Sequence, residues 1–189
     1  MPKGGSTQFK LSMQAELARA GTPLVFEPDC QNVHCARFPW PAWPAPERVV
    51  RIVRHPLERM LSAYLDGKHL RHWPLQRQFA PNVSFSDVVR RVTALPDALV
   101  NPHLRRQTAM CVAPPSVPQT ILKLEEYGIW RPWLLHELHW ADDALPTMPV
   151  SQTTTAARVA EFYTPELRKL VLEWAAPDLQ EFGYANHTQ

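Results

Sequence analysis

A buried-strand pattern passes directly into a helical pattern in the middle of the chain, where residues 49–68 read VVRIVRHPLERMLSAYLDGK. An apolar, β-branched run too short for a helix is formed by Val49, Val50, Ile52 and Val53, which is typical of a central parallel strand covered on both faces. Pro56 suits the first turn of a helix because its φ is already fixed near the helical value. The sequence therefore predicts a strand, a short basic turn and a helix that opens at Pro56.

The predicted helix has one apolar face. Its members recur at helical spacing and are Leu57, Met60, Leu61, Tyr64 and Leu65. The polar residues between them fall off that face and are Glu58, Arg59, Ser62 and Asp66.

Arg54 and Ser62 form a candidate oxyanion-binding pair in this stretch. Ligands of open α/β sheets bind outside the carboxyl ends of the strands, and Arg54 follows the predicted strand immediately. A guanidinium group is planar and can hold two phosphate oxygens at once, and Ser62 adds a hydroxyl from the helix. The alternative interpretation is that both residues are ordinary solvated residues of a strand-to-helix junction.

A second anion-binding pattern lies at residues 1–8, MPKGGSTQ, with a lysine before two glycines and then two hydroxyl residues. Glycines let the backbone turn its N–H groups toward an anion, and the positive end of a following helix favours negative charge there. A Walker A loop is excluded because that pattern places its lysine after the last glycine.

Together the two patterns resemble the cofactor motifs of sulfotransferases that use 3′-phosphoadenosine-5′-phosphosulfate (PAPS). The opening loop is similar to their 5′-phosphosulfate loop, and the spacing from Arg54 to Ser62 is similar to their 3′-phosphate motif. The sequence RHPLERMLSAY most resembles that of the Golgi carbohydrate sulfotransferases, the chondroitin and dermatan type among them. The resemblance implies a PAPS site made by Lys3, Gly4, Gly5, Ser6, Thr7, Arg54 and Ser62.

Two histidines are candidate catalytic bases, since a neutral imidazole can take a proton from an attacking hydroxyl at physiological pH. His34 lies between the two cofactor motifs, where the resemblance places a catalytic histidine. His103 belongs to residues 101–111, NPHLRRQTAMC, which resemble the D-x-H-x-x-x-Q-x-x-x-C block of the carbohydrate sulfotransferases. We rank His34 above His103, and either residue could be structural instead. Lys3 would also act in catalysis by neutralising charge on the oxygen that leaves sulfur.

A second strand is predicted at residues 119–125, QTILKLE, with Glu125 at its carboxyl end. Glu125 could orient a substrate hydroxyl or a basic residue, or it could form an ion pair that holds the loop. Helix caps are predicted at Ser84 or Ser86, and at Thr164 before a proline in the first helical position.

The composition favours one α/β domain over residues 1–189, because 189 residues with 45% hydrophobic content can bury one sizeable core. We expect a mostly parallel sheet flanked by helices, similar to the P-loop nucleotide-binding architecture of sulfotransferases. A net charge of only +2 argues against a nucleic-acid partner that needs a broad basic surface. The three cysteines have no zinc-finger spacing, and we expect no metal.

The expected partner is a carbohydrate acceptor. The basic loop at residues 68–82 could meet an anionic glycan, but a solvated loop is the slightly preferred interpretation. The sequence as given has no apolar run of membrane-spanning length and no signal peptide, so it reads as soluble. The resemblance nevertheless implies a Golgi membrane protein with an N-terminal anchor that this sequence does not contain. The family's first strand either precedes residue 1 or is missing from the fold. The sequons at Asn82 and Asn186 are compatible with a glycoprotein. The alternative function is a truncated, non-catalytic domain that binds nucleotide or glycan without turnover.

Overall fold

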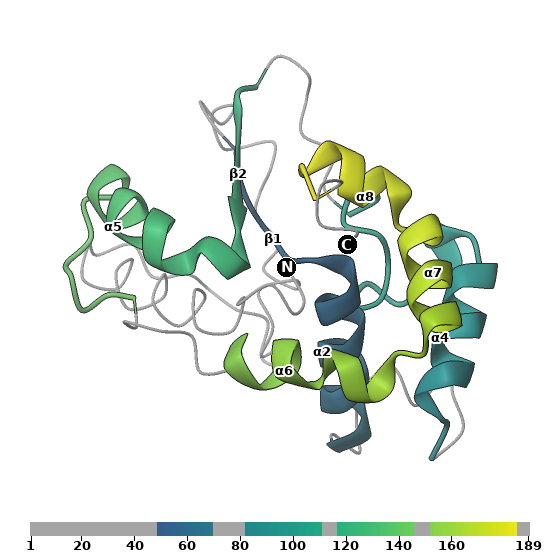
Figure 1. Ribbon diagram of the computed structural model, residues 1–189. Coiled ribbons are helices and arrows are strands. Elements are labelled where there is room, and N and C mark those ends of the chain that lie inside the picture. Colours follow the sequence, from purple (N-terminus) through teal and green to yellow (C-terminus); the bar gives the residue numbers. More distant parts are fainter. Residues whose placement is uncertain (1–48, 70–81, 111–116, 146–151, 185–189) are drawn as a thin grey trace, which may run out of the picture.

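The computed structural model describes residues 49–69, 82–110, 117–145 and 152–184 (Figure 1). These residues form a mixed α/β structure with a parallel pair of strands and several helices. In chain order, the elements are β1 (Val49–Val53), α2 (Pro56–His69), α4 (Phe85–Ala94), η3 (Asp97–Leu99), β2 (Gln119–Lys123), η4 (Leu124–Glu126), α5 (Tyr127–Glu137), α6 (Gln152–Phe162), α7 (Pro165–Trp174) and α8 (Ala176–Glu181).

β1 and β2 pair in parallel, in a register that places Val49 opposite Gln119 and Val53 opposite Lys123. Side chains alternate between the two faces of a strand, so consecutive residues of β1 pack into different clusters. Ile52 packs with residues of β2 and α5, whereas Val53 packs with Leu179 and Phe182 from the C-terminal segment. α5 and α8 accordingly lie on opposite sides of the strand pair (Figure 1). This confirms the prediction of a parallel strand covered on both faces.

α2 begins at Pro56, as predicted, and packs against α4, α6 and α7. Leu57, Met60, Leu61 and Tyr64 are buried, which confirms most of the predicted apolar face. Arg59 and Ser62, which lie off that apolar face, are buried as well. The helix is covered on more than one side, by the other helices and by the segment that contains Pro102 and Arg105.

The helix caps follow local sequence signals. The Ser84 hydroxyl accepts a hydrogen bond from the Asp87 backbone N–H at 3.1 Å, so Ser84 rather than Ser86 caps α4. The Thr164 hydroxyl accepts from the Leu167 N–H at 3.3 Å, and Pro165 is the first residue of α7. Both caps satisfy backbone donors that the first helical turn leaves without an intrahelical partner.

β2 ends at Lys123, two residues before the predicted end of the strand, and Glu125 lies in the 3₁₀ turn η4. The Trp130 side chain donates from Nε1 to the Lys123 carbonyl at 2.6 Å. That carbonyl therefore bonds to the first turns of α5 at the point where the strand stops. Within the described ranges, none of the helices combines the length and the apolar character that crossing a bilayer requires.

Candidate anion-binding site

Arg54 follows β1 directly, and its side chain is only 1% exposed. Its Nε and Nη2 groups donate to Oε2 of Glu58 at 3.2 and 3.0 Å. Glu58 lies in the first turn of α2, so the guanidinium group is held between the end of the strand and the start of the helix. The interpretation of Arg54 as a solvated junction residue is therefore wrong.

The backbone of Arg54 is fixed by a side chain from a distant segment. The Gln107 amide accepts from the Arg54 N–H at 2.9 Å and donates to the Arg54 carbonyl at 2.8 Å. These two hydrogen bonds pair with the backbone just beyond the end of β1 in the way that a neighbouring strand would. Gln107 itself is buried, so the main chain beneath the guanidinium group is held firmly in place.

Ser62 lies on the same face of α2 as Glu58, because residues four apart are neighbours along a helix. Glu58, which contacts the guanidinium group of Arg54, thus lies one helical turn before Ser62. Ser62 is buried at 9% exposure, so it is not an ordinary solvated residue either.

Two polar groups of this site are available to a ligand. Among the residues that the structure describes, no hydrogen bond reaches Nη1 of Arg54 or the hydroxyl of Ser62. No fully buried side-chain nitrogen or oxygen in the described ranges lacks a partner, so both groups reach the small exposed areas of their residues. An anion that approached Arg54 and Ser62 would meet guanidinium N–H groups and a hydroxyl without displacing a protein hydrogen bond.

Burial raises the pKa of Glu58 above its ordinary value, although the charge and hydrogen bonds of Arg54 work in the opposite direction. The nearby carboxylate of Glu125 adds to the upward shift. Desolvation penalises the ionised form of a carboxyl group, and a like charge does the same. The site thus joins a permanent cation to a carboxyl group that holds its proton more tightly than an exposed glutamate.

Glu125 is occupied by two hydrogen bonds that hold the end of the sheet together. Its Oε1 accepts from the His55 backbone N–H at 2.6 Å, and its Oε2 accepts from the Tyr184 hydroxyl at 2.9 Å. Gly183, at φ 67°, turns the chain after α8 so that Tyr184 can reach back. Burial and the charge of Glu125 raise the pKa of Tyr184, which keeps its hydroxyl protonated as a donor. The sequence interpretation had missed Tyr184 as a member of this site.

The His103 ring is oriented by Asn101. The Asn101 side-chain oxygen accepts from the His103 backbone N–H at 2.9 Å and lies 2.8 Å from the ring Nδ1. Because the backbone N–H can only donate, the shared atom must be oxygen, and Nδ1 must then carry a proton. In the neutral ring this leaves the lone pair on Nε2, which is the form that a general base requires.

Several predicted site residues lie outside the described residues, namely Lys3, Gly4, Gly5, Ser6, Thr7 and His34. Arg54, Ser62 and His103 lie inside them, and the first two share one face of the strand-to-helix junction. No protein-family model, curated protein or solved structure matches the chain. The resemblance to sulfotransferases therefore rests on the sequence motifs alone.

The segment that carries His103 is attached to α2 by Arg59. The Arg59 guanidinium group donates to the carbonyl of Arg105 at 2.6 Å and to that of Pro102 at 2.9 Å. Burial lowers the pKa of Arg59 to about 10, while the charge of Asp178 works to raise it. The group therefore stays charged at neutral pH and uses that charge to order the loop.

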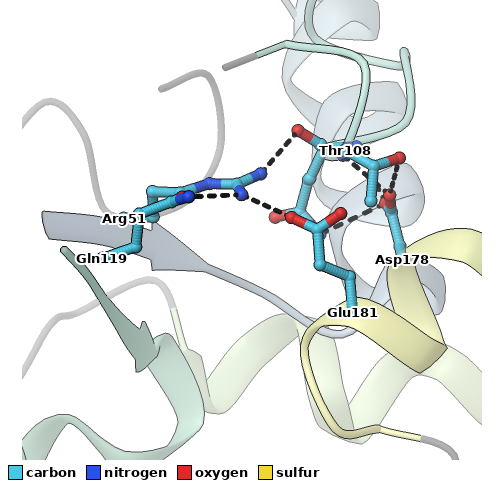
Figure 2. A network of polar contacts seen from close by, with 6 residues as sticks. Arg51, Thr108, Gln119, Asp178 and Glu181 are labelled. Carbon is cyan, nitrogen blue, oxygen red and sulfur yellow. Dashed lines mark hydrogen bonds and ion pairs between the residues drawn. The ribbon is translucent and has the colours of Figure 1, made fainter. Parts of the chain in front are cut away.

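Asp178 and Arg51 attach the same segment to α8 and to the sheet (Figure 2). Asp178 is 2% exposed and accepts from the backbone N–H groups of Gln107 at 2.8 Å and Thr108 at 2.9 Å, and from the Thr108 hydroxyl at 2.8 Å. Arg51, on β1, reaches Glu181 at 2.5 Å and the Gln107 carbonyl at 3.2 Å. The network connects the sheet, the His103 segment and the C-terminal helix.

Proposed function

We propose that this chain is a PAPS-dependent carbohydrate sulfotransferase with the P-loop-like fold of that class, and that Arg54 and Ser62 hold the 3′-phosphate of the cofactor. The observation that carries the proposal is the buried Arg54 at the carboxyl end of a parallel strand, with Ser62 one turn beyond its guanidinium contact on the next helix. The motif resemblance supplies the identity of the anion.

The opposite end of the cofactor is assigned to the opening loop. The backbone N–H groups of Gly4, Gly5, Ser6 and Thr7 would bind the 5′-phosphosulfate, and Lys3 would neutralise the oxygen that bridges sulfur and phosphate. The acceptor hydroxyl oxygen bonds to sulfur as the bond from sulfur to this bridging oxygen breaks. The bridging oxygen keeps the electron pair and leaves as part of 3′,5′-bisphosphoadenosine.

The hydroxyl proton passes to a histidine in this scheme. His34 is the first candidate, by its place between the cofactor motifs, and His103 is the second. The Asn101 contact supports His103 as a competent base, because it leaves Nε2 unprotonated in the neutral ring. The acceptor would be a glycan, and the Golgi membrane location follows from the same motif resemblance.

Turnover assays with labelled PAPS and a panel of desulfated glycosaminoglycans test this proposal. His34→Ala should lower kcat and leave cofactor binding unchanged, because a general base acts on the acceptor proton. Full activity of His34→Ala, with loss of kcat in His103→Ala, would move the base to His103. Absence of sulfate transfer to every acceptor by the active-site-intact protein would contradict the enzymatic function.

The alternative is a sulfotransferase-like domain that binds nucleotide or glycan without turnover. In either case Glu58 pairs with the Arg54 guanidinium group, which reduces the charge available to a phosphate. Binding of 3′,5′-bisphosphoadenosine together with no turnover on any acceptor is the result that this candidate predicts.

A further inference from the structure

Glu58 contacts the guanidinium group that would bind the proposed phosphate. Its Oε2 takes both donors on the Nε and Nη2 side of Arg54, and the Glu58 side chain is itself mostly buried, at 18% exposure. A phosphate bound to the remaining Nη1 group of Arg54 would therefore lie near a second negative charge, in a region with little water to screen it. Charges of equal sign at such distances cannot both remain ionised without a large cost.

We propose that Glu58 couples anion binding to proton uptake: its carboxylate neutralises Arg54 while the site is empty, and it accepts a proton when a phosphate group binds to Arg54. The inference rests on the proposed function in taking that phosphate to be the 3′-phosphate of the cofactor. The proton comes from solvent and forms an O–H bond on the Glu58 carboxyl group. The positive charge of Arg54 is then available to the phosphate, and the neutral carboxyl oxygen can still accept from the guanidinium group.

Glu58 and Glu125 differ in their hydrogen-bond partners, and this difference identifies Glu58 as the group that takes up the proton. Both oxygens of Glu125 already accept hydrogen bonds, from the His55 N–H and the Tyr184 hydroxyl. Glu58 has the Arg54 contacts on one oxygen, and a bound phosphate would compete for that charge. The upward pKa shift that burial gives to Glu58 in the empty site acts in the same direction.

Among the described residues, this part of the molecule also holds the titratable groups Tyr184, His55 and Glu126. The Tyr184 hydroxyl stays protonated because burial and Glu125 raise its pKa. The His55 Nδ1 accepts from the Leu57 N–H at 3.3 Å, so that ring nitrogen is unprotonated in the described arrangement. A substitution at Glu58 removes one carboxyl group and leaves these groups in place.

Calorimetric titration with 3′,5′-bisphosphoadenosine measures the coupling directly. The full chain is titrated at about pH 6 and about pH 8. Each titration is repeated in buffers of different ionisation enthalpy, which gives the number of protons taken up per ligand bound. The ligand's own phosphate protons contribute equally to every variant and cancel in the comparison. Glu58→Gln is compared with the parent chain and with Glu126→Gln. Glu126 is an exposed glutamate of η4 that pairs with Lys123.

Glu58→Gln should take up fewer protons than the parent chain at pH 6, and it should bind about tenfold more tightly at pH 8, because the competing charge is gone. Glu126→Gln should match the parent chain in both measurements. Equal proton numbers in the Glu58→Gln and parent proteins, or weaker binding by Glu58→Gln at both pH values, would overturn the inference. Thermal unfolding of each variant verifies that the compared proteins are folded.

A second probe separates this inference from the proposed function. If the parent chain does not bind 3′,5′-bisphosphoadenosine, the same titrations are made with inorganic phosphate. Phosphate binding with Glu58-dependent proton uptake would sustain the coupling and reject the nucleotide cofactor. Failure of both anions to bind would overturn both proposals, whereas nucleotide binding without Glu58-dependent uptake would overturn only the coupling.

Discussion

At the scale of single residues, the buried charges of Arg59 and Asp178 have partners from a distant part of the chain. Asp178 accepts from the backbone of Gln107 and Thr108, and Arg59 donates to carbonyls of the same segment. A buried charge without such partners would cost several kcal/mol, on the order of 3 to 5. These residues therefore determine whether the His103 segment is ordered at all.

Asp178→Ala should lower the free energy of unfolding by about 3 kcal/mol or more, because it leaves two backbone N–H groups and a hydroxyl buried without acceptors. Urea denaturation measures the change. Asp143→Ala is the matched control, since Asp143 is exposed and should change stability by less than about 0.5 kcal/mol. Equal, small effects of the two substitutions would contradict the anchoring role of Asp178.

Glu58 should leave a signature in the pH dependence of stability without any ligand. Its pKa in the folded state is raised above 4.5, so the folded chain binds this proton more tightly than the unfolded chain. Its contribution to stability is then fully present below the ordinary pKa and is lost as the pH rises through the folded-state pKa. The free energy of unfolding of the parent chain, relative to that of Glu58→Gln, should accordingly fall between about pH 4 and about pH 7, the range in which such a group titrates. Urea denaturation across this range checks it, and a difference that grows with pH would be the opposite result.

At the scale of elements, the helix ends depend on short-range signals. Ser84 caps α4 through the Asp87 N–H, whereas Ser86, two residues later, contacts only the Ser84 hydroxyl among the described hydrogen bonds. Ser84→Ala should therefore lower the free energy of unfolding by about 1 kcal/mol, and Ser86→Ala by clearly less. Thermal or urea unfolding of the two variants makes the comparison. A larger loss in Ser86→Ala would show that the cap has been assigned to the wrong serine.

The same contrast between local and distant contacts explains what the sequence could predict. β1, the start of α2 at Pro56 and the Thr164 cap follow from patterns that span a few residues, and all are present. The burial of Arg59 could not be predicted, because the carbonyls that solvate it lie more than 40 residues along the chain. Tyr184 was missed for the same reason: its contact with Glu125 depends on the turn at Gly183 and on the packing of α8.

At the scale of the whole molecule, the strand pair holds the candidate site between two helical groups. α5 packs against the Ile52 side of the sheet, and residues of α8 pack against the Val53 side (Figure 1). The carboxyl ends of β1 and β2 meet at the same edge, where Arg54 and Glu125 lie. That arrangement is the one in which open α/β sheets bind ligands. The proposed function requires that this edge of the sheet bind an adenosine 3′-phosphate through Arg54.

The most direct measurement is the affinity of 3′,5′-bisphosphoadenosine for the chain and for three variants. Arg54→Ala should lose about 1.5 to 3 kcal/mol of binding free energy, roughly tenfold to 150-fold in Kd, and Arg54→Lys, which keeps the charge without the planar fork, should fall between Arg54→Ala and the parent chain. Arg90→Ala, which removes an exposed arginine of α4, should bind like the parent chain. No binding to the parent chain, or equal affinity in folded Arg54→Ala and Arg54→Lys proteins, would contradict the claim.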